Sequence, residues 1–86
     1  MVVNIPVRLD KFLKVSRVIK RRTVASEVCR EGQVTVNGRP AKPGSEVAPG
    51  DRLEISLGER VIRLEVLEVR ENAAARDAAG LYRLLE

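Results

Sequence analysis

Residues 8–22 of the chain read RLDKFLKVSRVIKRR. This segment holds seven of the 16 Lys and Arg residues but one of the 12 Asp and Glu residues, so its charge is +6. The rest of the chain carries −2, which makes the net charge of +4 a local charge on a nearly neutral body. Such a concentration attracts a polyanion to one face of a protein, whereas a merely solvated helix face usually mixes both signs.

The same segment has the periodicity of an amphipathic helix. One side of a helical wheel collects the apolar and small residues Leu9, Phe12, Leu13, Ser16 and Ile19. The opposite side collects the bases Lys11, Lys14, Arg17 and Arg21. We therefore predict a helix that opens at Arg8, buries the apolar stripe and presents a row of bases. Val18 interrupts the basic side, so we expect the helix to break near Ser16.

A second helix is predicted from Arg22 to Glu31. Its apolar stripe consists of Ala25, Val28 and Cys29, and Gly32 is a natural C-terminal stop. We expect Cys29 to be a small buried apolar residue rather than a reactive thiol.

The start of this second helix carries charges that the helix dipole disfavours. Lys20, Arg21 and Arg22 lie where the dipole is positive, a position that favours Asp or Glu. Three bases there lower stability unless an anion joins them, and free N–H groups beside clustered Arg form a good phosphate site. The loss of stability at the start of this helix therefore indicates that an anion binds there.

Beyond Gly32 the period changes to two, which predicts antiparallel strands over 33–36, 39–41, 52–57 and 60–69. The turns between them are Asn37-Gly38, a strong type I′ signal, followed by Pro43-Gly44, Pro49-Gly50-Asp51 and Gly58-Glu59. Leu53, Ile55 and Leu57 share one face of their strand. The segment 60–69 has apolar residues on both faces, which leaves its buried face open.

The C-terminal part is rich in alanine between residues 73 and 79, which predicts a short helix that Gly80 ends. Residues 81–85 are expected to pack back on the body as a strand or extended segment. The fold class is α+β: two N-terminal helices packed on a small, strongly bent antiparallel sheet, with a short C-terminal helix and extended tail. We divide the chain into an N-terminal arm (1–7), one domain (8–69) and a tail (70–86).

Composition excludes several classes of site. The chain has no His and a single Cys, so a His/Cys zinc site, a Cys–His or Ser–His–Asp catalytic group and an internal disulfide are all ruled out. With one Phe, one Tyr and no Trp, it lacks a stacking platform for single-stranded bases, so we expect any bound nucleic acid to be read by shape and phosphate rather than by splayed bases. No apolar run approaches the roughly 18 residues of a membrane span, and residues 1–7 are too short and lack the charged leader expected of a signal peptide. We expect a cytoplasmic protein without cofactor or metal.

Together these pieces resemble a known RNA-binding family, the S4 domain first seen in small-subunit ribosomal protein four. The resemblance rests on RLDKFL (8–13), Ser16-Arg17, Arg22, Ala25, GQVTVNG (32–38) and Pro49-Gly50-Asp51, in that order and spacing. It implies the S4-like, alpha-L fold, in which the two helices set a basic face on structured RNA and contact mostly phosphate and ribose. Arg8, Arg17 and Arg22 fall where the family uses bases to grip the RNA backbone. Arg21 departs from the pattern, because many members carry a Ser or Thr cap there.

A narrower resemblance is to the small ribosome-associated quality-control proteins of the RqcP type. It is carried by residues 8–23 and by Ala78-Ala79-Gly80-Leu81-Tyr82, and it spans nearly the whole chain. It implies binding to an obstructed large ribosomal subunit that still holds peptidyl-tRNA, with contacts to ribosomal RNA and tRNA. It also implies cooperation with an elongating partner that adds alanine tails to stalled chains. A related alternative is the ribosome-recycling type of the fifteen-kilodalton heat-shock protein.

The candidate RNA-binding residues are Arg8, Lys11, Lys14, Arg17, Lys20, Arg21 and Arg22. Asp10 has two interpretations: a structural charge in the first turn that pairs with Lys14, or a group that orients Arg8 or a neighbouring base. No catalytic or metal-binding residue is predicted, and a monomer is the expected state. Glu59, Glu65 and Glu68 form either a solvated face or, less favoured, a partner surface.

Two other classes stay as alternatives. The S4 domain also occurs as the RNA-recognition module of RNA-modifying enzymes, but the residues that follow the motif are too few for a catalytic domain. A DNA-binding or protein-interaction module is physically allowed by the basic helices. No second recognition feature supports it.

Overall fold

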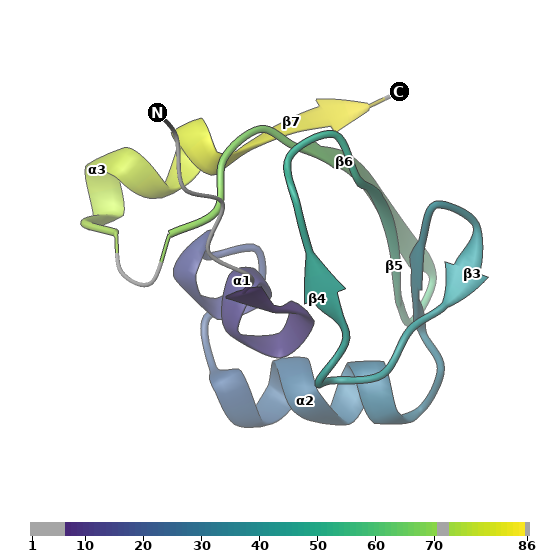
Figure 1. Ribbon diagram of the computed structural model, residues 1–86. Coiled ribbons are helices and arrows are strands. Elements are labelled where there is room, and N and C mark those ends of the chain that lie inside the picture. The colour runs from purple at the N-terminus through teal and green to yellow at the C-terminus, as the bar shows by residue number, and fades with distance from the viewer. Residues whose placement is uncertain (1–6, 71–72, 86) are drawn as a thin grey trace.

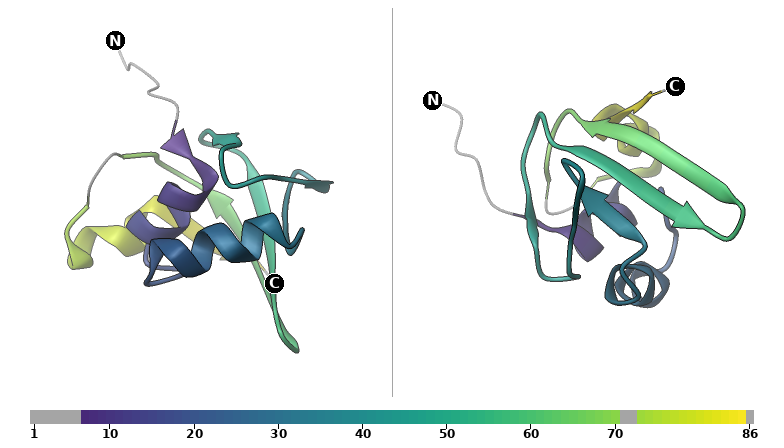
Figure 2. Two further views of the ribbon diagram at one scale, coloured as in Figure 1. Left: turned by 90° about the horizontal axis from the view of Figure 1, so that it is seen from below. Right: turned by 90° about the vertical axis from the view of Figure 1, so that its right-hand side faces the viewer.

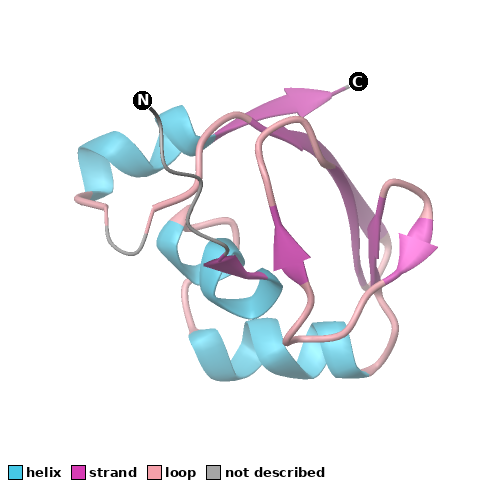
Figure 3. Cartoon of the chain, viewed as in Figure 1, coloured by secondary structure: helices cyan, strands magenta, loops and turns pink. Residues whose placement is uncertain are grey.

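The computed structural model describes residues 7–70 and 73–85 (Figure 1). Its helices and strands, in chain order, are β1 (Val7–Arg8), α1 (Leu9–Val15), α2 (Arg22–Arg30), β2 (Val34–Val36), β3 (Arg39–Pro40), β4 (Glu46–Val47), β5 (Arg52–Leu57), β6 (Arg60–Val66), α3 (Ala75–Ala78), the 3-10 turn η1 (Ala79–Leu81) and β7 (Tyr82–Leu85). The two-helix, bent-sheet α+β architecture that the sequence predicted is confirmed (Figure 3). Most of the expected arm, residues 1–6, lies outside the described residues, and Val7 pairs with Val47 of β4.

Five antiparallel strands form the main sheet in the order β3-β2-β5-β6-β7. α1 and α2 lie on one side of its curved surface, as the two views of Figure 2 show. The side chains that meet between helices and sheet are almost wholly aliphatic and include Leu9, Phe12, Leu13, Ala25, Val28, Val34, Leu53, Ile55, Leu64 and Val66. This single core fixes the angle between the two basic helices.

The α1 segment confirms both the apolar stripe and the predicted break. The helix begins at Leu9, one residue after the predicted start, and Ser16 is its C-cap. The first two N–H groups donate to the loop before β4, from Leu9 to the Ser45 carbonyl (2.7 Å) and from Asp10 to the Pro43 carbonyl (3.2 Å). These bonds satisfy donors that a helix start otherwise leaves unpaired.

The predicted hairpin turn at Asn37-Gly38 is confirmed. Asn37 has φ 53° and Gly38 has φ 83°, the two positive angles of a type I′ turn. The Asn37 side chain also ties the turn to β5, because its Oδ1 accepts from the Arg52 N–H (2.9 Å) and its Nδ2 donates to Asp51 (3.1 Å). Gly32, with φ 76°, ends α2 in the manner predicted.

The structure settles which face of β6 is buried. Leu64 and Val66 are buried, whereas Val61 is 51% exposed, so the even-numbered apolar residues face the helices. The prediction that the strand continues to Val69 is wrong, because it ends at Val66. The N–H groups of Leu67 and Glu68 both donate to the carbonyl of Leu81 (2.9 and 3.2 Å) instead of continuing the ladder.

The C-terminal segment returns to the body through Leu81, which is 1% exposed. Gly80, predicted to end the short helix, instead lies inside the 3-10 turn that carries Leu81 into the core. β7 then pairs with β6 as the last strand of the sheet. On the outer face Glu65 pairs with Arg83, and Arg70 pairs with Glu68 (2.8 Å), so these two acids lie among bases at the surface.

The single thiol gives a first prediction. Burial, and secondly the charge of Asp10, raise the pKa of Cys29 to about 11 from its ordinary 9.0. Near neutral pH it should therefore react with a disulfide reagent only as fast as the protein opens. The unfolded chain loses this proton first, so folding stability should fall as pH rises from about 9 toward 11.

Labelling rates measured across low urea concentrations test this, with Cys29→Ala as the control for the pH dependence. Rapid labelling of the native protein, at a rate that urea does not change, would show that the thiol is accessible.

Candidate nucleic-acid interface

The corner where α1 meets α2 brings together the seven predicted bases. Arg8 is the N-cap of α1, Lys11 and Lys14 lie on α1, and Arg21 is the N-cap of α2. Arg17 and Lys20 lie in the connection between the helices, and Arg22 is the first residue of α2. Six of the seven are exposed, and Lys11 is half-buried. The fold thus turns a linear run of bases into one surface, which we call the basic corner.

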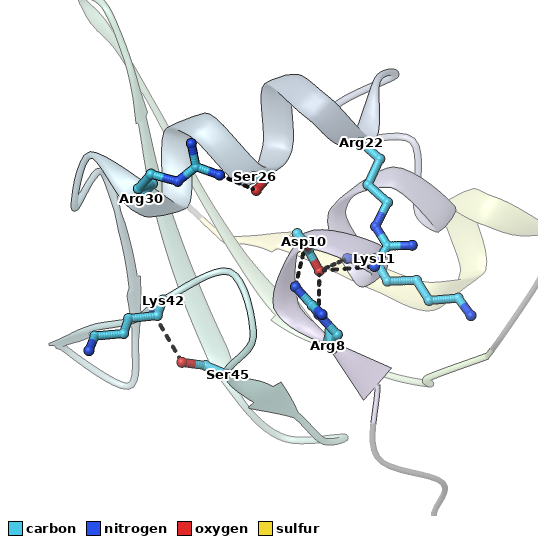
Figure 4. A network of polar contacts seen from close by, with 8 residues as sticks. All are labelled: Arg8, Asp10, Lys11, Arg22, Ser26, Arg30, Lys42 and Ser45. Atoms are coloured by element: carbon cyan, nitrogen blue, oxygen red, sulfur yellow. Dashed lines mark hydrogen bonds and ion pairs between the residues drawn. The ribbon is translucent and has the colours of Figure 1, made fainter.

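Asp10 organises one half of this corner, as Figure 4 shows. Its carboxylate accepts two hydrogen bonds from Arg8, from Nε (3.2 Å) and from one terminal nitrogen (3.1 Å). It also accepts from the backbone N–H of Lys11 (2.8 Å) and lies 3.8 Å from a guanidinium nitrogen of Arg22. The structure therefore pairs Asp10 with Arg8 and Arg22, rather than with Lys14.

Burial of Asp10 contrasts with exposure of its partners. The Asp10 side chain is 3% exposed, whereas those of Arg8 and Arg22 are 55% and 49% exposed. A buried carboxylate requires such partners, because an unpaired buried charge is costly. Each guanidinium has five donors, so both arginines keep donors that face the solvent. The arrangement pairs two guanidinium groups with one carboxylate, one from the N-cap of α1 and one from the first residue of α2.

The N-terminus of α2 lies beside these arginines and has no side-chain cap. Arg21 occupies the N-cap position in an extended conformation (φ −114°, ψ 129°) and makes no side-chain cap hydrogen bond. The first turn of α2 contains no acidic residue. Unpaired N–H groups and the positive end of the dipole thus coincide with Arg21 and Arg22, which suits a phosphate oxygen.

A second group of bases lies around the end of α1. Lys14, Arg17 and Lys20, together with Val15 and Ala73, line a small cavity of about 80 Å³. Three cationic side chains and no acid line a space that would hold little more than a single small ion or a phosphate group. We call this the three-base cavity.

Arg17 adopts a backbone conformation that is unusual for its residue type. Its φ of 62° is left-handed, and it follows directly after the C-cap of α1. Its N–H donates to the Lys14 carbonyl (3.0 Å), and that of Ile19 donates to Leu13 (3.1 Å), so the reversal closes the helix. Glycine normally occupies such positions, and another residue costs about 1–2 kcal/mol there. Arginine at this position therefore lowers the folding stability relative to glycine.

Sequence reasoning missed two further bases near this surface. Arg30 lies on α2 two turns after Arg22, with Ser26 between them, and donates to the Ser26 hydroxyl (3.4 Å; Figure 4). Arg22, Ser26 and Arg30 follow one another at a spacing of four residues, and this helical spacing could have predicted that Arg30 lies along α2 from Arg22. Lys42 could not have been found this way, because it lies on the loop whose carbonyls bind the start of α1. Its own N–H donates to the Ser45 hydroxyl (3.0 Å).

Among residues 7–70 and 73–85 there is no group of three His, Cys, Asp or Glu side chains that could hold a metal ion. In the same part of the chain, no helix has the length and apolar character needed to cross a membrane. The exposed bases and the uncapped start of α2 offer the binding of anions by cations and backbone N–H groups.

Comparisons with known proteins agree with the resemblance drawn from the sequence. The S4 domain family model matches residues 7–53. A protein of Halalkalibacterium halodurans named RQC P-site tRNA stabilizing factor is 52% identical over 75 residues, which are 87% of this chain and 85% of that protein. A protein of the same name from Bacillus subtilis is 46% identical over 79 residues, 92% of each chain.

The fold also has a close match among solved structures. Heat shock protein 15 of Vibrio cholerae, described as trimeric, matches with a TM-score of 0.86 and 30% sequence identity. The match covers 94% of this chain and 83% of that one. On its motifs, its fold and these similarities over most of its length, the chain belongs to the S4 domain family and, within it, to the RQC P-site tRNA stabilizing factors.

Proposed function

We propose that this protein is an RNA-binding factor of ribosome-associated quality control, which holds a P-site tRNA on an obstructed large ribosomal subunit. The observation that carries the proposal is the pair of arginines, Arg8 and Arg22, fixed by the buried Asp10 beside the uncapped start of α2. The names and mutual coverage of the relatives support the cellular role.

Binding proceeds through phosphates. Arg8 and Arg22 present guanidinium forks that match phosphate oxygens bidentately, and the N–H groups at the start of α2 add fixed donors. The three-base cavity takes a further phosphate at the other end of α1. We propose that these two parts of the basic corner contact two RNA backbones, one of the tRNA and one of the large-subunit ribosomal RNA.

The protein acts without chemistry of its own in this proposal. By fixing the peptidyl-tRNA, it keeps the stalled chain in position for an elongating partner that adds alanine residues to its C-terminus. It works in the cytoplasm as a monomer and requires no cofactor. Lys11, Lys14, Lys20 and Arg21 add to the long-range attraction, because electrostatic steering depends on summed charge.

A second candidate function is ribosome recycling of the heat-shock type, and the match to heat shock protein 15 favours it. The two roles predict different defects in a strain that lacks this protein. In a strain that lacks this protein, a stalled reporter chain should lose its alanine tails if the quality-control role is right. Unchanged tails together with slower recovery of large subunits would favour recycling.

We expect Arg22→Gln and Arg8→Gln each to weaken binding to large subunits and tRNA at least tenfold. The expectation follows from the loss of a charge-assisted hydrogen bond, worth about 1.5–3 kcal/mol. Each variant should also lower the slope of log affinity against log salt by about one unit. Sedimentation through sucrose gradients and filter binding at several salt concentrations measure both effects.

The matched control is Arg52→Gln, which removes an exposed arginine from β5, outside the basic corner. It should change affinity and slope little. Equal losses from Arg52→Gln and Arg22→Gln would mean that net charge alone governs binding, and the assignment of the basic corner would be wrong.

Replacement of Arg17 by Gly should separate binding from stability. Glycine takes the left-handed conformation without strain, so unfolding in urea should show stability that is unchanged or raised by about 1 kcal/mol. Affinity for RNA should fall at the same time, because the three-base cavity loses a cation. Unchanged affinity for RNA would show that Arg17 does not contribute to the interface.

Asp10→Asn tests whether the buried carboxylate positions the arginines. The variant raises the net charge, so a purely electrostatic effect would strengthen RNA binding. We expect weaker binding instead, because the amide no longer fixes the two guanidinium groups. Stability should fall by about 1 kcal/mol, less than for a wholly buried pair, because both arginines can turn to water.

Glu27→Gln provides the comparison, since it makes the same charge change at an exposed position of α2. It should strengthen binding slightly. If Asp10→Asn also strengthens binding, the carboxylate has a structural role alone.

A further inference from the structure

A groove continues from the basic corner to the end of the sheet. It measures about 240 Å³ and is lined by Arg17, Val18, Arg60, Ile62, Tyr82 and Leu84. Ile62, Tyr82 and Leu84 lie on the face of β6 and β7 that turns toward the helices. The helices cover this face only in part, because Leu64 is fully buried whereas its partner Leu84 is 65% exposed.

The lining combines an apolar floor with cations at its rim. Val18, Ile62 and Leu84 are aliphatic, Tyr82 contributes a half-buried ring, and no acidic residue lines the groove. Arg17 comes from the connection between α1 and α2, and Arg60 from the start of β6. Arg17 also lines the three-base cavity, so the groove and the proposed phosphate site are adjacent and have this residue in common.

We propose that this groove takes one unpaired nucleotide of the bound RNA. The inference rests on the proposed RNA-binding function and extends it from backbone contacts to a base. The base would pack on Tyr82 and the aliphatic side chains, while Arg17 and Arg60 neutralise its phosphates. A positive groove with an aromatic ring is the usual site for an unstacked base. The volume is below that of a pocket for a drug-sized ligand, which limits the occupant to about one base.

An apolar side chain of a protein partner is the competing occupant. It would use the floor but would leave two arginines beside it without anions. The charge of the rim therefore favours the nucleotide.

Tyr82 gives a direct signal, because it is the chain's only Tyr and there is no Trp. A short single-stranded oligoadenylate should quench its fluorescence, whereas an abasic ribose-phosphate strand of equal length should not. Tyr82→Leu should weaken oligoadenylate binding about fivefold or more and leave binding of the abasic strand unchanged. Tyr82→Phe keeps the ring and should retain the affinity.

Leu67→Ala is the matched control, because Leu67 is an exposed apolar residue that does not line the groove. It should bind both strands like the unmodified protein. Circular dichroism establishes that each variant is folded.

The outcomes separate this inference from the function on which it rests. Equal binding of both strands with unchanged Tyr82 fluorescence would overturn the base site and leave the phosphate contacts standing. Failure to bind either strand, large subunits or tRNA would contradict the proposed function itself. If Tyr82→Leu keeps oligoadenylate affinity but abolishes binding to a protein of the large subunit, the groove belongs to a protein partner and the inference is wrong.

Discussion

The carboxylate of Asp10 is buried, and a buried charge is costly unless it is paired and hydrogen-bonded. The carboxylate accepts from Arg8, which precedes α1, and from the backbone N–H of Lys11 on α1, and it pairs with Arg22, which opens α2. One charged group therefore joins the start of the first helix to the start of the second, while the backbone N–H of the same residue donates to Pro43 in the loop before β4. Because the same two arginines are half exposed, the interaction that joins these segments also shapes the surface that they present.

Much of the fold was predictable because its signals are local. The apolar stripe of α1, the stop at Gly32 and the turn at Asn37-Gly38 each follow from residue periodicity or backbone preference. Two of the departures share a tertiary origin. β6 ends at Val66 and Gly80 lies within a turn because Leu81 is buried and its carbonyl takes two N–H groups. Periodicity within one segment carries no information about such a contact.

The residues of the candidate site were likewise predictable only in part. The seven bases adjacent in sequence were found, since charge density can be counted, and the absence of an acid or a cap at the start of α2 was visible at Arg21 and Arg22. Lys42 and Arg60 were not found, because only the path of the chain brings them near the basic corner or its groove. Composition also suggested that aromatic stacking is absent. That argument counts aromatic rings, but it cannot show that the single tyrosine lines the same groove as two arginines.

Three local rules are broken close together in the described part of the chain. Arg17 adopts a left-handed conformation, Arg21 stands where a cap is preferred, and Asp10 is a buried acid, all within the two-helix corner. The conformation of Arg17 and the missing cap at Arg21 each cost on the order of 1–2 kcal/mol, comparable to what one fully buried leucine contributes. The aliphatic core offsets this cost, since Leu9, Leu13 and Leu64 are wholly buried. Under the proposed function these conflicts lie on the surface that binds RNA, where residues are expected to be selected for binding rather than for stability.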